Sequence, residues 1–200
     1  MGILIWAHEN DAVEFVRKEQ RYLQNNYTNK NAVRNVIRDI TRSRENEQEY
    51  SHLIAYGAFG CELNAPTEWL IQEFLCIQNI YNIEGRKGRR MYHEIFSLLD
   101  EEVAGLYYNM GFLYSIAAEC ARWYFEQGHQ VVFAIHHQSR FHIHFAVNTI
   151  NHKTGMKFHT TKPEKEAREM LFNQILNKYL EIAKIPIVPI EFCPGYMTAQ

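Results

Sequence analysis

The sequence lacks any long apolar run and any amino-terminal export signal. No stretch approaches the ~20 consecutive apolar residues that a membrane-spanning helix needs. The opening residues, MGILIWAHENDAVEF, contain a short apolar run followed by acids, whereas a signal peptide has a basic flank and a longer apolar core. We therefore expect no membrane insertion and a cytoplasmic location.

Paired cysteines and an excess of basic charge are also missing. The cysteines are widely spaced and form no C-x-x-C pair: Cys61, Cys76, Cys120 and Cys193. This pattern favours free thiols in a reducing cytosol and argues against a disulfide framework.

The formal net charge is −2, which excludes a surface that is basic throughout, so any nucleic-acid site must be local.

The sequence does contain enough apolar material for one core. Hydrophobic residues make up 46% of the 200 positions, which suits a single domain over residues 1–200. Apolar periodicity and capping residues predict helices at 11–23, 32–43, 66–82, about 100–127 and 163–183. Short apolar or alternating runs predict strands at 3–7, 53–62, 90–98, 128–136 and 141–150. The sum is an α+β domain with a central, mostly antiparallel sheet and packed helices.

The last two predicted strands carry a group of histidines. GHQVVFAIH and FHIHFAVNTI are separated by only a few polar residues, which is typical of an antiparallel hairpin. His142 and His144 are two residues apart, so both side chains face one side of the sheet, as does that of Asn148. His136 ends the preceding strand and can meet them; His137 is the alternative, but strand alternation lets only one of this pair face the site. Three neutral imidazoles would form a facial site for a divalent ion, with positions left open for substrate.

This hairpin resembles a motif of a known family. The stretch GHQVVFAIHHQSRFHIHFAVNTINHKTGMKFH is similar to the third motif of conjugative relaxases and mobilisation nucleases, in which a histidine ends one strand and H-x-H followed by asparagine forms the next. The GRRMYHEIFSL strand and the AYG run before it resemble the middle section of that family. The resemblance spans roughly Val33 to His159.

The family consists of HUH-type endonucleases, and the resemblance implies a fold of that kind. It implies that His136, His142 and His144 hold Mn²⁺ or Mg²⁺, in preference to Zn²⁺, against the scissile phosphate of single-stranded DNA at a transfer origin. A tyrosine then attacks, leaving a 5′-phosphotyrosyl enzyme and a free 3′-hydroxyl. It further implies a bacterial protein with accessory DNA-binding and coupling proteins as partners, and a nuclease domain that forms the amino-terminal part of a longer chain.

One departure from the family concerns the residue that orients an imidazole. The family usually has an aspartate shortly after the first histidine of this motif, and here the local sequence is HHQSR, with Gln138 near that place. Glu94, on the 90–98 strand, is a candidate substitute. The competing interpretation of Glu94 is a solvated or capping glutamate.

A second departure concerns the nucleophile. The family tyrosine lies on a helix that resembles AVRNVIRDITRS, and the aligned position here holds Asp39. A carboxylate is a poor nucleophile toward a phosphodiester anion, which repels it. Either this copy lacks the nucleophile, by nature or by engineering, and is inactive, or Tyr27 or Tyr22 serves instead.

Basic residues flank both features. Arg86, Lys87, Arg89 and Arg90 precede the 90–98 strand, and Arg38, Arg42 and Arg44 lie around the helix with Asp39. We expect these groups, together with Asn148, to contact DNA, although charge runs of this kind also occur as solvated loops.

Three functions fit the sequence. The first is metal-dependent, site- and strand-specific nicking and rejoining of DNA for conjugative transfer of a mobile element. The second is a relaxase-fold DNA-binding module that lacks the nucleophile. The third is a histidine–metal enzyme acting on a small substrate, which stable zinc retention without salt-sensitive DNA binding would favour.

Overall fold

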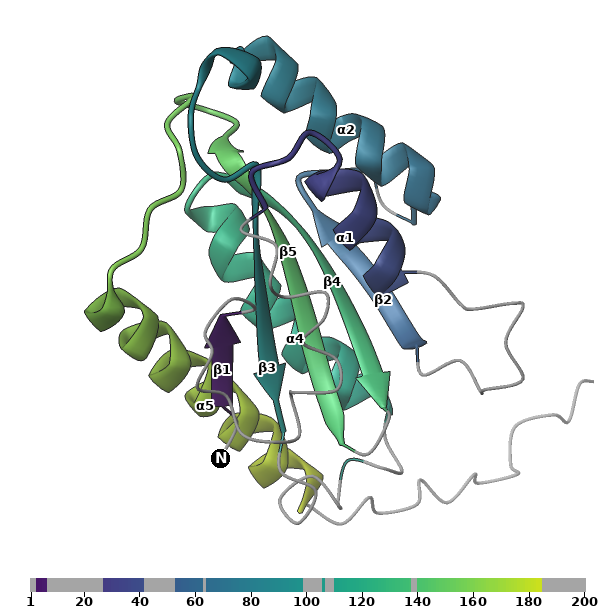
Figure 1. Ribbon diagram of the computed structural model, residues 1–200. Helices are drawn as coiled ribbons and strands as arrows, with labels where there is room; N and C mark the ends of the chain where they lie inside the picture. Colours follow the sequence, from purple (N-terminus) through teal and green to yellow (C-terminus); the bar gives the residue numbers. More distant parts are fainter. Residues whose placement is uncertain are drawn as a thin grey trace, which may run out of the picture.

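A single antiparallel sheet forms the centre of the molecule (Figure 1). The computed structural model describes residues 3–6, 27–41, 53–62, 64–98, 106, 110–137 and 140–184. The strands are β1 (Ile3–Trp6), β2 (Leu53–Phe59), β3 (Met91–Ser97), β4 (His129–His137) and β5 (Phe141–Asn151). Their order is β1-β3-β5-β4-β2, so β5 is the central strand, and every neighbouring pair is antiparallel. The predicted α+β class is confirmed.

Helices cover both faces of this sheet (Figure 1). The α-helices described are α1 (Ala32–Thr41), α2 (Thr67–Ile80), α4 (Met110–Glu126) and α5 (Lys162–Ala183), with a 3₁₀ turn, η2 (Ile83–Gly85), after α2. Helices α1 and α2 pack with the sheet residues Val132 and Ala146 into one core. Helices α4 and α5 pack with Phe133 and Phe145 into the other, on the opposite face. Adjacent residues of one strand therefore serve two different cores, as strand alternation requires.

The helix with the predicted apolar stripe forms as expected. Val33, Val36, Ile37 and Ile40 of α1 are all buried, whereas Asp39 is exposed. This spacing places the apolar side chains on one side of the helix, against α2 and the sheet. The carboxyl end of α1 consequently lies close to β4 and β5, which α1 contacts.

The last helix begins where its capping residues predict. Thr161 and Glu164 form a capping box: the Glu164 carboxylate accepts from the Thr161 backbone N–H at 2.6 Å, and the Thr161 side chain meets the backbone of Glu164. Pro163 occupies the first turn, where its missing N–H has no intrahelical acceptor to lose.

One predicted boundary is wrong and one predicted helix is untested. The acids after Asp100 suggested a helix starting there, but Leu106 lies in a 3₁₀ turn and α4 begins at Met110. Leu106 therefore does not lie in the same α-helix as Met110, and residues 99–105 and 107–109 lie outside the described part of the chain. The helix predicted at 11–23 lies outside the described residues.

Candidate metal centre

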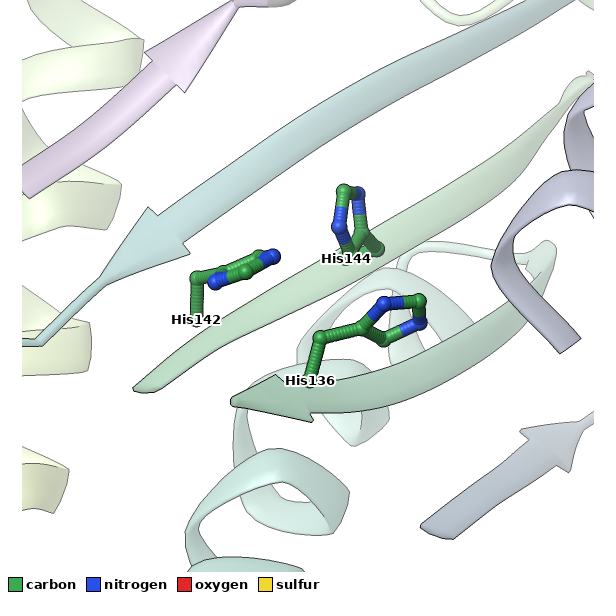
Figure 2. Close-up of side chains that lie close together, drawn as sticks. All are labelled: His136, His142 and His144. Carbon is green, nitrogen blue, oxygen red and sulfur yellow. The ribbon is translucent and has the colours of Figure 1, made fainter. Parts of the chain in front are cut away.

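The register of the β4–β5 hairpin brings three histidines together on one face of the sheet. His136 lies directly opposite His142, and His144 lies opposite Ala134. Figure 2 shows the three rings projecting from these two neighbouring strands toward one another. One ring nitrogen from each lies within 4.8 Å of the others. The choice of His136 over His137 as the third member follows from alternation, since the His137 ring lies against Phe141, with centroids 4.3 Å apart.

Backbone carbonyls define the tautomers of two of these histidines. His136 donates from Nε2 to the carbonyl of Ile40, at the end of α1, at 2.8 Å. His142 donates from Nδ1 to the carbonyl of Arg140 at 3.1 Å. A carbonyl oxygen only accepts, so the bonded nitrogen carries the proton. In the neutral ring the other nitrogen, Nδ1 of His136 and Nε2 of His142, then keeps its lone pair, as a metal ligand must.

The third histidine has a side-chain partner instead. His144 Nδ1 lies 2.8 Å from Nε2 of His93, which projects from β3 onto the same face. His93 Nδ1 lies in turn 3.1 Å from the hydroxyl of Tyr27. Tyr27, His93 and His144 are all buried. The hydrogen-bond partners of the three histidines therefore come from α1, from Arg140 just before β5, and from β3.

Burial keeps the inner histidines neutral. The pKa of His93 is lowered to about 3, first by burial and then by the nearby His136 and His142. The pKa of His144 is lowered well below its usual value, again first by burial and then by the neighbouring histidines. A neutral His144 together with His136 and His142, each of which has one unprotonated nitrogen when its ring is neutral, forms a donor set that fits a divalent metal ion.

Glu94 does not orient an imidazole, and that prediction is wrong. Adjacent residues of a strand face opposite sides, so Glu94 points away from His93 into the core beneath α5. There its carboxylate accepts hydrogen bonds from Arg168, through Nη2 at 2.6 Å and Nε at 3.1 Å, and from the Tyr124 hydroxyl. Both charged side chains are buried, with exposed fractions of 0% for Glu94 and 1% for Arg168.

The residue that the sequence reasoning missed is His93. His93 precedes Glu94 directly. The two-residue spacing of a strand puts His93 on the same face as the apolar Met91 and Ile95. The missing information was the pairing of β3 with β5, which sets Ile95 opposite His144. The sequence analysis named the carboxylate of Glu94 as the partner of an imidazole, whereas the structure places the imidazole of His93 beside His144.

Comparison with known proteins identifies the family. The sequence pattern described as relaxase, MobA/VirD2-like, nuclease domain matches residues 45–180. The chain belongs to the relaxase family. No curated protein sequence matches it. A solved structure, described as the molecular basis of vancomycin resistance transfer in Staphylococcus aureus, is similar over 76% of this chain and 85% of that chain, with 16% identity and a TM-score of 0.45.

The family match covers His136, His142 and His144 but not the predicted nucleophile positions. Asp39 is exposed on α1, next to Ile40, whose carbonyl holds His136. Tyr27 is only 3% exposed, and burial is the main cause that raises the pKa of its hydroxyl. Tyr22, Gln138 and Arg42 lie outside the described residues.

Asn148 is a structural residue of this relaxase domain, and the prediction that it contacts DNA is wrong. Its exposed fraction is 0%, although it shares a face with His142 and His144. Its amide donates to the Phe74 carbonyl at 3.1 Å and to Gln130 Oε1 at 2.8 Å, and its oxygen accepts from Gln78 at 3.0 Å. Packing of α2 over this part of β5 turns the polar side chain into a bridge between helix and sheet.

The predicted DNA-contacting arginines divide between two places. Arg38 lies on α1 and pairs with Glu68 of α2 at 2.5 Å. Residues 86–90 form a loop before β3. This loop lies at one end of β3, and the triad lies near the other end. Arg86 and Lys87 are exposed, Arg89 stacks on Tyr92, and Arg90 pairs with Glu84. The side chain of Lys157 donates to the carbonyls of Lys87 and Arg89, which ties the loop to the turn after β5.

None of the helices in the described part of the chain has the length and apolar character needed to cross a membrane.

Proposed function

We propose that this relaxase domain nicks and rejoins one strand of DNA at a transfer origin, with Mn²⁺ or Mg²⁺ held by His136, His142 and His144. The observation that carries the proposal is the convergence of three imidazole nitrogens within 4.8 Å, in a chain of a DNA-nicking family. A bound divalent ion would supply positive charge against the non-bridging oxygens of the scissile phosphate.

The protein's own groups have two tasks in this reaction. The carbonyls of Ile40 and Arg140 hold the first two imidazoles with their lone pairs toward the centre. A tyrosine oxygen forms a new bond to phosphorus while the bond from phosphorus to the 3′ oxygen breaks. The phenol proton ends on that 3′ oxygen, leaving a 5′-phosphotyrosyl ester and a 3′-hydroxyl. Rejoining is the same exchange in reverse.

Tyr27 is the nucleophile that this proposal names. Its hydroxyl is linked through His93 to His144, so it belongs to the same hydrogen-bonded group as a triad member. The hydroxyl must turn out of its buried position to reach a phosphate, since Tyr27 is 3% exposed.

A second candidate function rests on Asp39. The residue after it, Ile40, contacts His136, which supports the alignment of Asp39 with the family tyrosine. In that case the domain binds origin DNA and the ion without strand transfer, because the carboxylate cannot replace a phenol toward an anionic phosphate.

The deciding experiment traps the covalent product. We would incubate the protein with Mn²⁺ and labelled single-stranded transfer-origin DNA, and measure adducts that survive denaturant. The panel is the unchanged protein, His136→Ala, the double variant His142→Ala/His144→Ala, Tyr27→Phe and Asp39→Tyr. His137→Ala is the matched control for His136→Ala, because the two histidines are adjacent and face opposite sides of β4.

Each outcome selects one function. An adduct that is lost in the triad variants, and that is lost in Tyr27→Phe even at saturating Mn²⁺, supports nicking by Tyr27. An adduct only from Asp39→Tyr supports the module without a nucleophile. If no variant forms adducts or binds DNA, the relaxase activity is rejected in favour of a metal enzyme acting on a small substrate.

A further inference from the structure

A buried chain of hydrogen bonds ends at one member of the triad. Tyr27 Oη lies 3.1 Å from His93 Nδ1, and His93 Nε2 lies 2.8 Å from His144 Nδ1. The exposed fractions of the three side chains are 3%, 7% and 8%, respectively. They come from the residues before α1, from β3 and from β5, so only the assembled sheet and helix layer bring them together.

These hydrogen bonds differ from those of His136 and His142 because no carbonyl oxygen fixes which atom donates and which accepts. Every member of the chain can donate or accept, since a neutral imidazole has one nitrogen of each kind and a hydroxyl does both. Two arrangements are therefore open. In one, protons point from Tyr27 toward His144; in the other, they point from His144 toward Tyr27.

Only the second arrangement is compatible with a ligand role for His144. With Nδ1 occupied by His93, the nitrogen that remains for an ion is Nε2, which must be unprotonated. His144 must then carry its proton on Nδ1 and donate it to His93 Nε2. The neutral His93 carries its own proton on Nδ1 and donates to the oxygen of Tyr27.

We propose that His93 is a positioning residue of the metal centre, which accepts from His144 Nδ1–H and is held in the matching tautomer by Tyr27. The inference rests on the proposed metal role of the triad. Packing alone does not require this histidine, because its neighbours on the same face of β3 are the apolar Met91 and Ile95, both in the α1–α2 core. The hydrogen bonds to Tyr27 and His144 do require it.

The first test measures Mn²⁺ affinity by calorimetry, using MnCl₂ and the whole chain. His93→Phe fills the space and removes the acceptor, and we expect it to weaken Mn²⁺ binding about 10- to 100-fold, as loss of such partners does. His93→Gln keeps an amide oxygen that can accept from Nδ1–H, so we expect it to restore most of the affinity. His129→Phe is the matched control, because His129 is also a buried sheet histidine, bonded to the carbonyl of Asn148.

Tyr27→Phe separates the positioning role from a purely catalytic one. It removes the acceptor of His93 Nδ1–H, and we expect Mn²⁺ affinity to fall by about 3- to 10-fold, on the order of one lost hydrogen bond. A tyrosine that served only as nucleophile would leave Mn²⁺ affinity unchanged.

The second test observes the proton itself. Nitrogen NMR of the protein saturated with diamagnetic Mg²⁺ distinguishes Nδ1–H from Nε2–H imidazoles, and we expect the Nδ1–H form for His144 and its loss in His93→Phe. An Nε2–H form in the unchanged protein would overturn the inference, and so would unaltered Mn²⁺ affinity in His93→Phe. If the unchanged protein does not bind Mn²⁺, the metal role itself fails, which this panel separates from a failure of His93 alone.

Discussion

At the scale of single residues, the burial of His93 and His144 determines how the domain responds to mild acid. Both have a folded pKa below the value of about 6.5 that an unfolded chain shows. Above that pH both states are neutral at these positions, and their contribution to stability is constant. Below it the unfolded chain takes up protons that the folded domain refuses, so stability is lost as the pH falls from about 6.5 toward the folded pKa.

We predict that the metal-free domain loses stability as the pH falls from about 6.5 to 5, by up to about 1.4 kcal/mol per pH unit for each of these histidines. Urea denaturation in the presence of a chelator measures it. This window lies above the usual pKa of carboxylates, so their contribution is small there. His93→Phe should flatten the dependence, and an unchanged slope in that variant would contradict the assignment.

The same scale shows where the sequence was informative about the site. His142 and His144 were placed on one face by a two-residue spacing, which is a local property of any strand. His93 and Asn148 could not be assigned in this way. The role of His93 depends on its pairing with another strand, and that of Asn148 depends on the helix α2 that covers it.

At the scale of elements, α5 is held to the sheet by a buried ion pair. Arg168 on α5 reaches Glu94 on β3, 74 positions away in the sequence, and its guanidinium lies over the rings of Trp123 and Tyr124. Apolar periodicity predicted α5 correctly, but it could not show that an arginine faces inward, because the partner lies on a distant strand.

We predict that Arg168→Met destabilises the domain by about 3–5 kcal/mol, because it leaves the Glu94 carboxylate buried without its counter-charge. Chemical denaturation measures the change. The double variant Arg168→Met/Glu94→Leu should recover most of it, since both charges are then gone. Lys178→Met is the control, because Lys178 pairs with Glu119 at the surface, where such pairs contribute about 0–1 kcal/mol. Equal losses in Arg168→Met and Lys178→Met would reject the prediction.

At the scale of the whole molecule, the triad and the 86–90 loop lie toward opposite ends of the sheet. Met91, which follows the loop, pairs with Asn148, four residues along β5 from His144. At the usual rise of a strand this is about 13 Å. A DNA strand that reaches both must therefore extend along the molecule rather than bind at one point.

We predict that Lys87→Gln/Arg89→Gln weakens binding to single-stranded DNA and lowers the salt dependence. Each lost phosphate contact should reduce the slope of log affinity against log salt by about 0.7. Fluorescence anisotropy at several salt concentrations measures both quantities. Lys178→Gln/Lys184→Gln removes two exposed charges, one on α5 and one directly after it, on the other layer, and should leave the slope unchanged. The same loss in both double variants would indicate nonspecific attraction.

The overall architecture was the part most accessible from the sequence. Every strand and α-helix within the described residues was predicted from local sequence patterns, with boundaries that shifted by a few residues except at α4, which begins at Met110; the 3₁₀ turn η2 was expected to be a loop. The strand order and the layer that each helix joins could not be predicted locally. They depend on pairing between strands that are distant in the sequence, such as β3, which lies between β1 and β5.

The partners of the three histidines come from separate parts of the chain: the carbonyl of Ile40 from α1, that of Arg140 from the turn before β5, and the ring of His93 from β3. The β4–β5 hairpin alone carries all three histidines but only one of these partners. A designer who grafted that hairpin onto another sheet would copy the ligands and lose the orientation of two of them. The transplantable unit is therefore the hairpin together with the end of α1 and the neighbouring strand.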